Sequence, residues 1–262
     1  MKTLQPAYIT GILVAVLAIL GCNPGPQNGS SIVEPLDEPP AIVPLPNLSS
    51  YTRGWWQERF AEKCAEMEQR GAEVQILLIG DSILHYLENT GQQPYAEFLQ
   101  PYGVINFGFS SDRTEHALWR LKNAPLESIS PRAAVVLIGT NNTGQRNDSA
   151  SDVLRGIQLV CEEVTTRLPS TQVILLHLLP KGRDPAHPAR LTDQEINQSL
   201  AVLAEHNPKL SVVDFNHVFL DQQNPLTIRR DLMPDYLHPN AAGYHILLAE
   251  LKTYLLPFLS QP

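Results

Sequence analysis

Five short apolar runs alternate with stretches of helical periodicity along most of this 262-residue chain. Most of the runs are continuously apolar, which is typical of strands buried on both faces of a parallel sheet. This alternation predicts an α/β domain of three layers, α/β/α, around a mostly parallel five-stranded sheet with right-handed crossovers. The expected strands span residues 74–79, 103–107, 134–138, 173–178 and 210–214.

Helical patterns separate these strands, as the crossovers of a parallel sheet require. Residues 181–189 break the alternation with two prolines and a glycine, so they are predicted to form a loop. The expected helices span residues 55–69, 114–122, 151–167, 192–205 and 240–255.

The N-terminus carries a targeting pattern. An apolar run at residues 9–20 follows Lys2 and is shorter than the ~20 residues that a membrane-spanning helix needs. We therefore expect residues 1–21 to be a secretory signal peptide. Cys22 stands where the run stops, in a segment that resembles a bacterial lipobox, in which the cysteine is lipidated. The alternative is an ordinary cleaved signal followed by an incidental cysteine.

Lipidation at Cys22 would anchor the chain in a bacterial cell envelope, in the periplasm or on the outer surface, whereas an ordinary signal would release it. Residues 22–50 are rich in proline and are predicted to form a semi-rigid linker or plain disorder. Residues 51–262 are then predicted to form one folded domain. A net charge of −8, with no basic run in the domain, argues against nucleic acid as a partner.

Two polar side chains follow expected strands at the edge of the sheet where ligands bind in such folds. Two residues separate Ser82 from the end of the first strand, and it stands at the turn into a short helix, where its hydroxyl could act as a nucleophile. The alternative role for Ser82 is a helix cap. Asn141 follows the third strand through a Gly-Thr turn, where its amide could donate to an oxyanion or merely form the turn.

Asp-x-x-His pairs occur at Asp214 and His217 and at Asp235 and His238, and this spacing lets a carboxylate orient an imidazole. Asp235 and His238 lie in a loop before the last helix, whereas Asp214 ends the expected fifth strand. We favour Asp235 and His238 as the catalytic pair, chiefly because of the family resemblance that these segments carry, and expect the other pair to be structural. The spacing of the histidines shows no metal-binding motif, so no metal or other cofactor is expected.

Together, these segments resemble the SGNH (GDSL) hydrolase family, and within it the platelet-activating-factor acetylhydrolase subgroup. The resemblance covers roughly residues 56–255 and implies the SGNH form of the flavodoxin-like fold. Beyond the segments around Ser82, Asn141 and His238, it rests on residues 106–112, 116–123 and 178–182.

The resemblance also implies a role for each site residue. Ser82 would be the nucleophile, His238 the general base and then acid, and Asp235 the residue that orients it. The oxyanion hole would comprise the backbone N–H groups of Ser82 and Ser111 and the side chain of Asn141. The family usually has glycine where this chain has Ser111, and serine adopts a positive φ less readily. The residues that match positions confining the acyl chain are Ile83, Thr140 and Leu237.

The expected function is that of a serine esterase that hydrolyses short-chain, acetyl esters through an acyl-enzyme intermediate. Its expected partners are a small acyl ester, such as an acetylated carbohydrate or lipid, and the membrane that holds the lipid anchor. The alternatives are acyl transfer to a sugar and a non-catalytic binding lipoprotein on a hydrolase scaffold. Cys64 and Cys161 are expected to be free thiols, although the sequence leaves a disulfide open.

Overall fold

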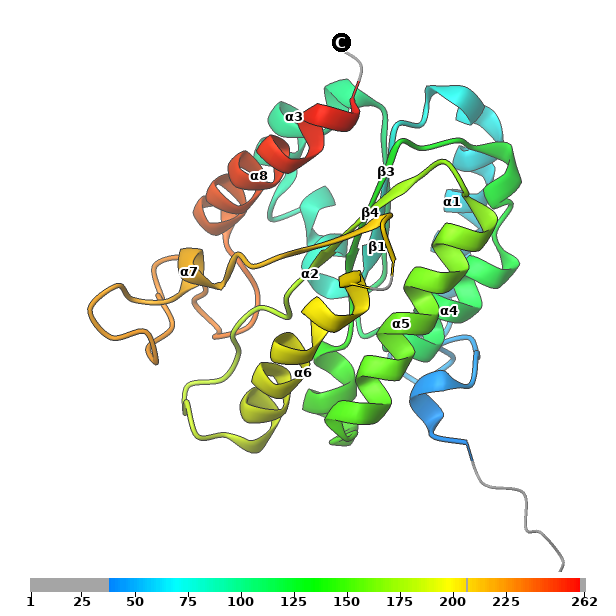
Figure 1. Cartoon of the computed structure of the whole chain (residues 1–262). Helices are drawn as coiled ribbons and strands as arrows, with labels where there is room; N and C mark the ends of the chain where they lie inside the picture. The colour runs from blue at the N-terminus through cyan, green and yellow to red at the C-terminus, as the bar shows by residue number, and fades with distance from the viewer. Residues whose placement is uncertain (1–37, 206, 260–262) are drawn as a thin grey trace, which may run out of the picture. The chain divides into compact units, whose positions relative to one another are not determined.

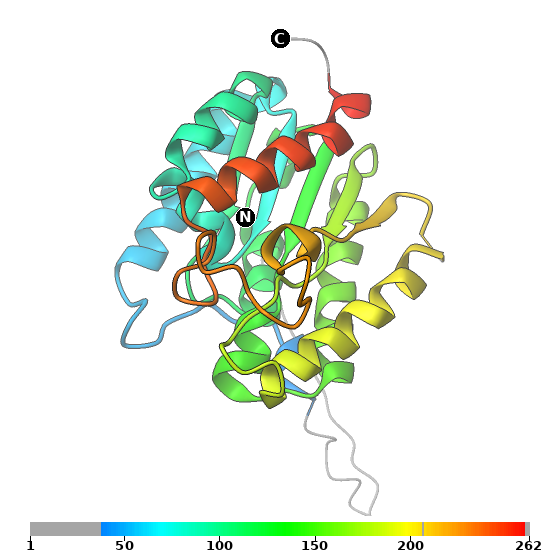
Figure 2. The same ribbon diagram turned by 90° about the vertical axis from the view of Figure 1, so that its left-hand side faces the viewer.

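The computed structural model describes residues 38–205 and 207–259, which contain a five-stranded parallel sheet (Figures 1 and 2). Each of the four strand pairings is parallel, and the strand order is β2-β1-β3-β4-β5. The first three strands are buried along their full length, as their continuous apolar runs predicted. The strands are β1 (Ile76–Gly80), β2 (Val104–Gly108), β3 (Ala133–Leu137), β4 (Gln172–Leu176) and β5 (Leu210–Val213).

Helices cover both faces of the sheet, which confirms the predicted three-layer α/β/α architecture. The layer on the right of Figure 1 contains α1 (Trp55–Arg70), α4 (Thr114–Asn123) and α5 (Ala150–Arg167), and α6 (Pro188–Glu205) packs beside α5. On the opposite face, α8 packs against α3. The remaining helices are α2 (Ser82–His85), α3 (Gln92–Phe98), α7 (Asn216–Phe219) and α8 (Ala241–Leu255).

Two helical segments differ from the prediction. The helix α6 begins at Pro188, four residues earlier than expected, so the predicted loop at 181–189 ends in the first helical turn. Proline fits that turn because it needs no hydrogen bond there and its φ is already helical. The seven-residue helix α3 was not predicted, because a segment this short with an internal Pro94 carries little periodic signal.

The predicted linker also ends earlier than expected. The compact unit begins at Glu38 rather than at residue 51. Ala41 is fully buried, and its carbonyl accepts a hydrogen bond of 2.8 Å from the hydroxyl of Thr114. Residues 38–50 therefore belong to the domain, because their polar groups find partners in it. The predicted signal peptide, Cys22 and the rest of the predicted linker lie outside the described residues.

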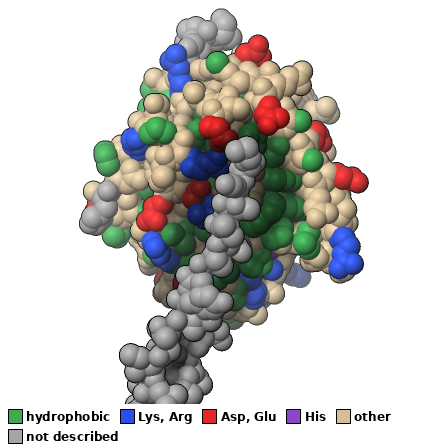
Figure 3. All heavy atoms as spheres, turned by 90° about the vertical axis from the view of Figure 1, so that its right-hand side faces the viewer, with side chains coloured by type: hydrophobic (Ala, Val, Ile, Leu, Met, Phe, Trp, Pro, Cys, Tyr) green, Lys and Arg blue, Asp and Glu red, His purple; other side chains and the backbone are tan. Residues whose placement is uncertain are grey.

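The described surface carries charges of both signs. On the face of the described domain that Figure 3 displays, acidic and basic side chains are interspersed among apolar ones.

Cys64 and Cys161 are free thiols, and burial raises the pKa of each, to about 11 and about 12 respectively. Within the described ranges, no helix is long and apolar enough to cross a membrane. No group of three acidic, histidine or cysteine side chains there could hold a metal ion.

Candidate active site

Ser82 is held at the sharp turn between β1 and α2. Gly80 ends β1 beside β3, where an added Cβ would lie 2.4 Å from the carbonyl oxygen of Leu137. Asp81 then caps α2, since its Oδ1 accepts a hydrogen bond of 2.9 Å from the N–H of Ile83. This local sequence places Ser82 as the first residue of the helix, at the carboxyl edge of the sheet.

Ser82, His238 and Asp235 form one hydrogen-bonded chain. The hydroxyl of Ser82 lies 2.9 Å from Nε2 of His238, although 156 residues separate them in the sequence. The other ring nitrogen of His238, Nδ1, lies 2.7 Å from Oδ2 of Asp235. The structure thus brings together a hydroxyl, an imidazole and a carboxylate in the order of a hydrolase triad.

The carboxylate of Asp235 is itself held in place. Its Oδ1 accepts hydrogen bonds from the backbone N–H groups of Leu237, at 3.0 Å, and His238, at 2.8 Å. Partial burial raises the pKa of Asp235, but the hydrogen bonds from His238 and Leu237 outweigh it and leave this pKa below its ordinary value. Asp235 is therefore a carboxylate at neutral pH, as a partner of an imidazolium must be.

Two tyrosine side chains hold the segments that contain Ser82 and His238. The ring of Tyr86 packs against the imidazole of His238, with 5.0 Å between the ring centroids. The hydroxyl of Tyr244, on α8, donates a hydrogen bond of 2.7 Å to the carbonyl of Ile83 on α2. The last helix is thereby tied to the helix that begins with Ser82.

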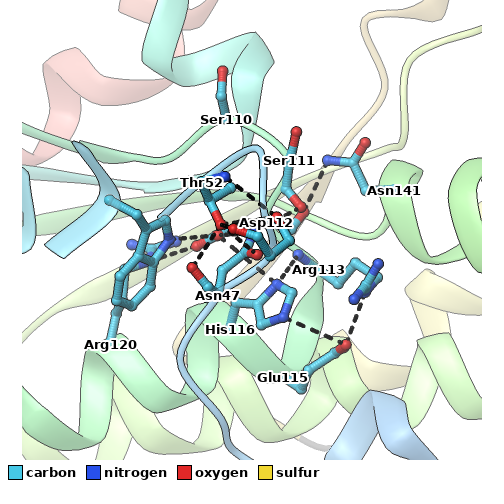
Figure 4. Close-up of polar contacts among 12 residues, drawn as sticks. Asn47, Thr52, Ser110, Ser111, Asp112, Arg113, Glu115, His116, Arg120 and Asn141 are labelled. Atoms are coloured by element: carbon cyan, nitrogen blue, oxygen red, sulfur yellow. Dashed lines mark hydrogen bonds and ion pairs between the residues drawn. The ribbon is translucent and has the colours of Figure 1, made fainter. Parts of the chain in front are cut away.

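Asn141 lies against the turn that contains Ser111, as Figure 4 shows. Its Nδ2 donates a hydrogen bond of 2.9 Å to the carbonyl of Asp112, and its Oδ1 accepts one of 3.0 Å from Nε2 of Gln145. An amide NH₂ carries two hydrogens, so one remains for another acceptor. Gln145 lies in a π-helical turn, Asn142–Arg146, that the sequence did not reveal.

Ser111 has a φ of 65°, in the left-handed region that usually belongs to glycine. The positive φ that the glycine of the resembling family suggested is thus present with a serine in its place. The carbonyl of Ser111 accepts a hydrogen bond of 3.2 Å from Asn47, which lies in the segment that was predicted to be linker.

Asp112 forms the buried centre of the network in Figure 4. Its carboxylate accepts hydrogen bonds from Trp56 Nε1, at 2.7 Å, from Asn47 Nδ2, at 3.1 Å, and from Arg120 Nε, at 2.8 Å. Burial raises the pKa of Asp112 to about 6, and the guanidinium of Arg120 opposes this rise. The Ser111 turn is therefore anchored from three separate elements.

Arg120 is fully buried and ties the ends of two strands together. It donates to the carbonyl of Gly80 at 3.1 Å and to that of Phe107 at 2.6 Å. Its guanidinium carbon lies 4.3 Å from the ring centroid of Phe109. The prediction from sequence missed this role, because an arginine in an amphipathic helix ordinarily faces solvent.

The three residues expected to confine the acyl chain differ in exposure. Ile83 and Thr140 are buried, and Leu237 is half-buried. Thr140 lies beside a buried lysine that the sequence did not single out: Nζ of Lys181 donates to the Thr140 carbonyl at 2.8 Å and pairs with Asp193 at 2.9 Å. Lys181 therefore fixes the turn that carries Asn141.

Asp214 and His217 do not form a pair in space. Nε2 of the exposed His217 lies 3.1 Å from a carboxylate oxygen of Glu250, whereas Asp214 contacts His177 at 3.6 Å. Asp214 and His217 thus have separate partners, and neither joins the hydrogen-bonded chain of Ser82.

We expect Gln145→Ala to lower kcat for ester hydrolysis by about tenfold, with KM nearly unchanged. Loss of an oxyanion donor itself costs about 10²–10³ in kcat, and a misoriented donor should cost less. Steady-state kinetics on one acetyl ester would measure both constants. Gln158→Ala is a matched control, because Gln158 bonds to Glu162 on the surface of α5. Equal effects of the two substitutions would refute the orienting role of Gln145.

We expect Ser111→Gly to raise the free energy of unfolding by roughly 0.5–1 kcal/mol. It removes the steric cost of the left-handed conformation, about 1–2 kcal/mol, but it also increases the conformational entropy of the unfolded chain. Ser111→Ala keeps the Cβ and should leave stability near wild type. Denaturant titration measures both variants, and kcat should survive in both because the backbone N–H remains. A collapse of kcat in Ser111→Ala would show that the hydroxyl takes part.

Comparison with known proteins agrees with this geometry. The model of the GDSL-like lipase/acylhydrolase family matches residues 78–246. The chain is 32% identical to the human platelet-activating factor acetylhydrolase IB subunit alpha1 over 225 residues, which cover 86% of this chain and 93% of the relative.

Solved structures share the fold at lower identity. A GDSL-like lipase from Bacteroides thetaiotaomicron superposes with a TM-score of 0.63 at 21% identity, covering 76% of this chain and 97% of its own. A carbohydrate acetylesterase from Sinorhizobium meliloti gives 0.56 at 14% identity, covering 70% and 99%. With the family model matched across the sheet and most of the relative's length aligned, this chain belongs to the GDSL-like lipase/acylhydrolase family of carboxylic ester hydrolases.

Proposed function

We propose that the protein hydrolyses short-chain, acetyl esters through an acyl-enzyme intermediate on Ser82. The observation that carries the proposal is the continuous chain from the Ser82 hydroxyl through His238 to Asp235, with links of 2.9 and 2.7 Å. A serine hydroxyl is a weak nucleophile on its own and needs a positioned base of this kind.

The reaction would proceed in two halves. Nε2 of His238 takes the proton of Ser82 as its oxygen attacks the ester carbonyl carbon, and the imidazolium is stabilised by Asp235. The C–O bond to the alcohol then breaks, and His238 returns its proton to the leaving oxygen. Water attacks the acyl-enzyme with its proton going to His238, and the carboxylic acid leaves as Ser82 regains a proton.

The oxyanion would be stabilised by three donors, which are the backbone N–H groups of Ser82 and Ser111 and the remaining amide hydrogen of Asn141. Preorganised donors are effective because they need no rearrangement when charge develops. The contacts that hold Asn141 to Asp112 and Gln145 support this role.

A small acyl pocket would come from Ile83, Thr140 and Leu237. The burial of Ile83 and Thr140 supports a site with little room for a long acyl chain. The names of two similar proteins, an acetylhydrolase subunit and a carbohydrate acetylesterase, also support acetyl as the acyl group.

The acyl preference can be tested with 4-nitrophenyl acetate, butyrate and octanoate. We expect kcat/KM to fall steadily from acetate to octanoate. Acetate release in the presence of a sugar acceptor would separate hydrolysis from transfer, since transfer consumes ester without forming acetate. A preference for octanoate would contradict the acetyl assignment.

The same proposal includes a lipid anchor at Cys22, at the end of the apolar run of residues 9–20. We expect Cys22→Ser to abolish fatty-acid labelling in bacterial cells and to release the protein from the membrane fraction. Metabolic labelling followed by fractionation measures both. Cys64→Ser is a suitable control, and equal label in wild type and Cys22→Ser would contradict lipidation.

A further inference from the structure

A hollow lies beside the loop that contains Asp235 and His238, next to Tyr236. Its volume is about 340 Å³, and its lining includes Arg183, Leu226, Ile228, Arg230 and Tyr236. Tyr236 stands directly after Asp235 and two residues before His238, so the wall of this hollow is part of the segment that carries the triad. The backbone of Tyr236 has a φ of 61°.

The wall of the hollow that contains Arg183 follows residues that are hydrogen-bonded to two parts of the active site. The N–H of Gly182 donates a hydrogen bond of 2.8 Å to the carbonyl of Tyr236. One residue earlier, Nζ of Lys181 donates to the carbonyl of Thr140, at 2.8 Å, next to Asn141. Lys181 and Gly182 therefore bridge the turn of Asn141 and the loop of His238, and the hollow begins at the next residue, Arg183. Figure 2 shows the segment before α6 beside the segment that follows α7.

Arg190 also links the two walls of the hollow. Arg190 is 2% exposed and donates to the carbonyl of Leu226, at 2.8 Å, and to that of Gly182, at 3.5 Å. Its Nε is buried without a hydrogen-bond partner in the described part of the chain. Arg190 thus places a third positive charge behind the hollow, and the carboxylate of Asp184 partly offsets it.

Two guanidinium groups line this hollow without a carboxylate partner. Across residues 38–205 and 207–259, no ion pair or hydrogen bond engages the side chain of Arg183 or Arg230. The nearest acidic neighbours in sequence have other contacts: Asp231 pairs with Arg229 at 2.7 Å, and Asp184 accepts the N–H of Ala186.

Arg230 is also oriented by an aromatic ring. Its guanidinium carbon lies 5.2 Å from the ring centroid of Tyr236, which is within range of a cation–π interaction. In a chain with a net charge of −8, two unpaired arginines at one hollow are a local positive site. Guanidinium groups suit carboxylate and phosphate because their donors match both oxygens of such anions.

We propose that the hollow binds an anionic group, carboxylate or phosphate, on the alcohol part of the ester substrate. This inference rests on the proposed esterase function of Ser82 and extends it to the substrate class. The anion lies between Arg183 and Arg230 while the ester carbonyl reaches Ser82. The preferred substrates are therefore acetyl esters of acidic alcohols, such as acetylated uronic acids or sugar phosphates.

The test compares three substrates: an O-acetylated methyl glucoside, the corresponding methyl glucuronoside, and the corresponding 6-phosphate. We expect wild type to hydrolyse at least one acidic ester about tenfold more efficiently than the neutral one, through a lower KM. The double variant Arg183→Gln/Arg230→Gln should lose this preference, with less than a twofold change on the neutral ester. Surface ion pairs of this kind contribute up to several-fold each.

Arg132→Gln is the matched control, because Arg132 is exposed and precedes β3 at the opposite edge of the sheet. The acidic preference should fall with rising salt in wild type and not in the double variant. A preference for the glucuronoside identifies a carboxylate subsite, and one for the 6-phosphate a phosphate subsite. Equal kcat/KM on all three esters would overturn the subsite while leaving the esterase intact. Failure to cleave any acetyl ester, 4-nitrophenyl acetate included, would overturn the proposed function instead.

Discussion

Replacing Ser82 with alanine is expected to lower kcat for acetyl-ester hydrolysis by about 10³-fold or more. The substitution removes the only atom that can form the acyl-enzyme, so neither half of the reaction can proceed by the proposed route. Folding should be nearly unaffected, because the side chain is small and its hydrogen bond is to His238, which is itself partly exposed. Stopped assays on purified protein with a matching circular-dichroism spectrum measure both effects.

Ser110→Ala is the matched control for this experiment. Ser110 is also buried near the site, and its hydroxyl has no partner among the described residues. Its backbone N–H donates a hydrogen bond of 3.1 Å to Nδ1 of His85, and the substitution leaves this bond in place. Ser110→Ala should therefore keep most of its activity. A Ser82→Ala protein that retains half of the wild-type kcat would refute the nucleophile assignment.

His238→Ala is expected to cost as much kcat as Ser82→Ala, because the two residues act as one unit and their effects do not add. Asp235→Ala should cost less, since the imidazole would remain but would lose its orientation. His217→Ala should leave kcat near wild type, because its ring contacts Glu250 at the surface. The kcat of each folded variant on one acetyl ester distinguishes the two pairs.

The outcome that would contradict this assignment is a collapse of kcat in His217→Ala with His238→Ala nearly intact. A double variant, Ser82→Ala/His238→Ala, sharpens the comparison. Its residual rate should match that of either single variant. A multiplicative loss would show that His238 acts outside the triad.

The sequence predicted the sheet well because each strand is a local feature. A buried parallel strand appears as a continuous apolar run, and the helix between two such runs fixes its direction and crossover. The positions of Ser82, Asn141 and His238 were equally predictable, since each lies shortly after a strand or before a helix. The structure places all three at the carboxyl edge of the sheet.

The supporting residues could not be predicted because their partners are far away in sequence. Asn47 lies in a proline-rich segment, and distant contacts such as those of Asn47 with Ser111 and Asp112, 64 and 65 residues away, reveal that this segment belongs to the domain. Arg120 and Lys181 are charged residues that would ordinarily face solvent. Their burial depends on carbonyl groups and carboxylates that the fold brings together from a strand, a turn and a helix.

Covalent labelling tests the central claim most directly. A fluorophosphonate carries an electrophilic phosphorus that reacts with an activated serine and leaves a stable adduct. Peptide mapping of the labelled protein should find one adduct per chain, on the peptide that contains Ser82, and His238→Ala should suppress it. Label distributed over other serines, or equal labelling of wild type and Ser82→Ala, would contradict a nucleophile at Ser82 activated by His238.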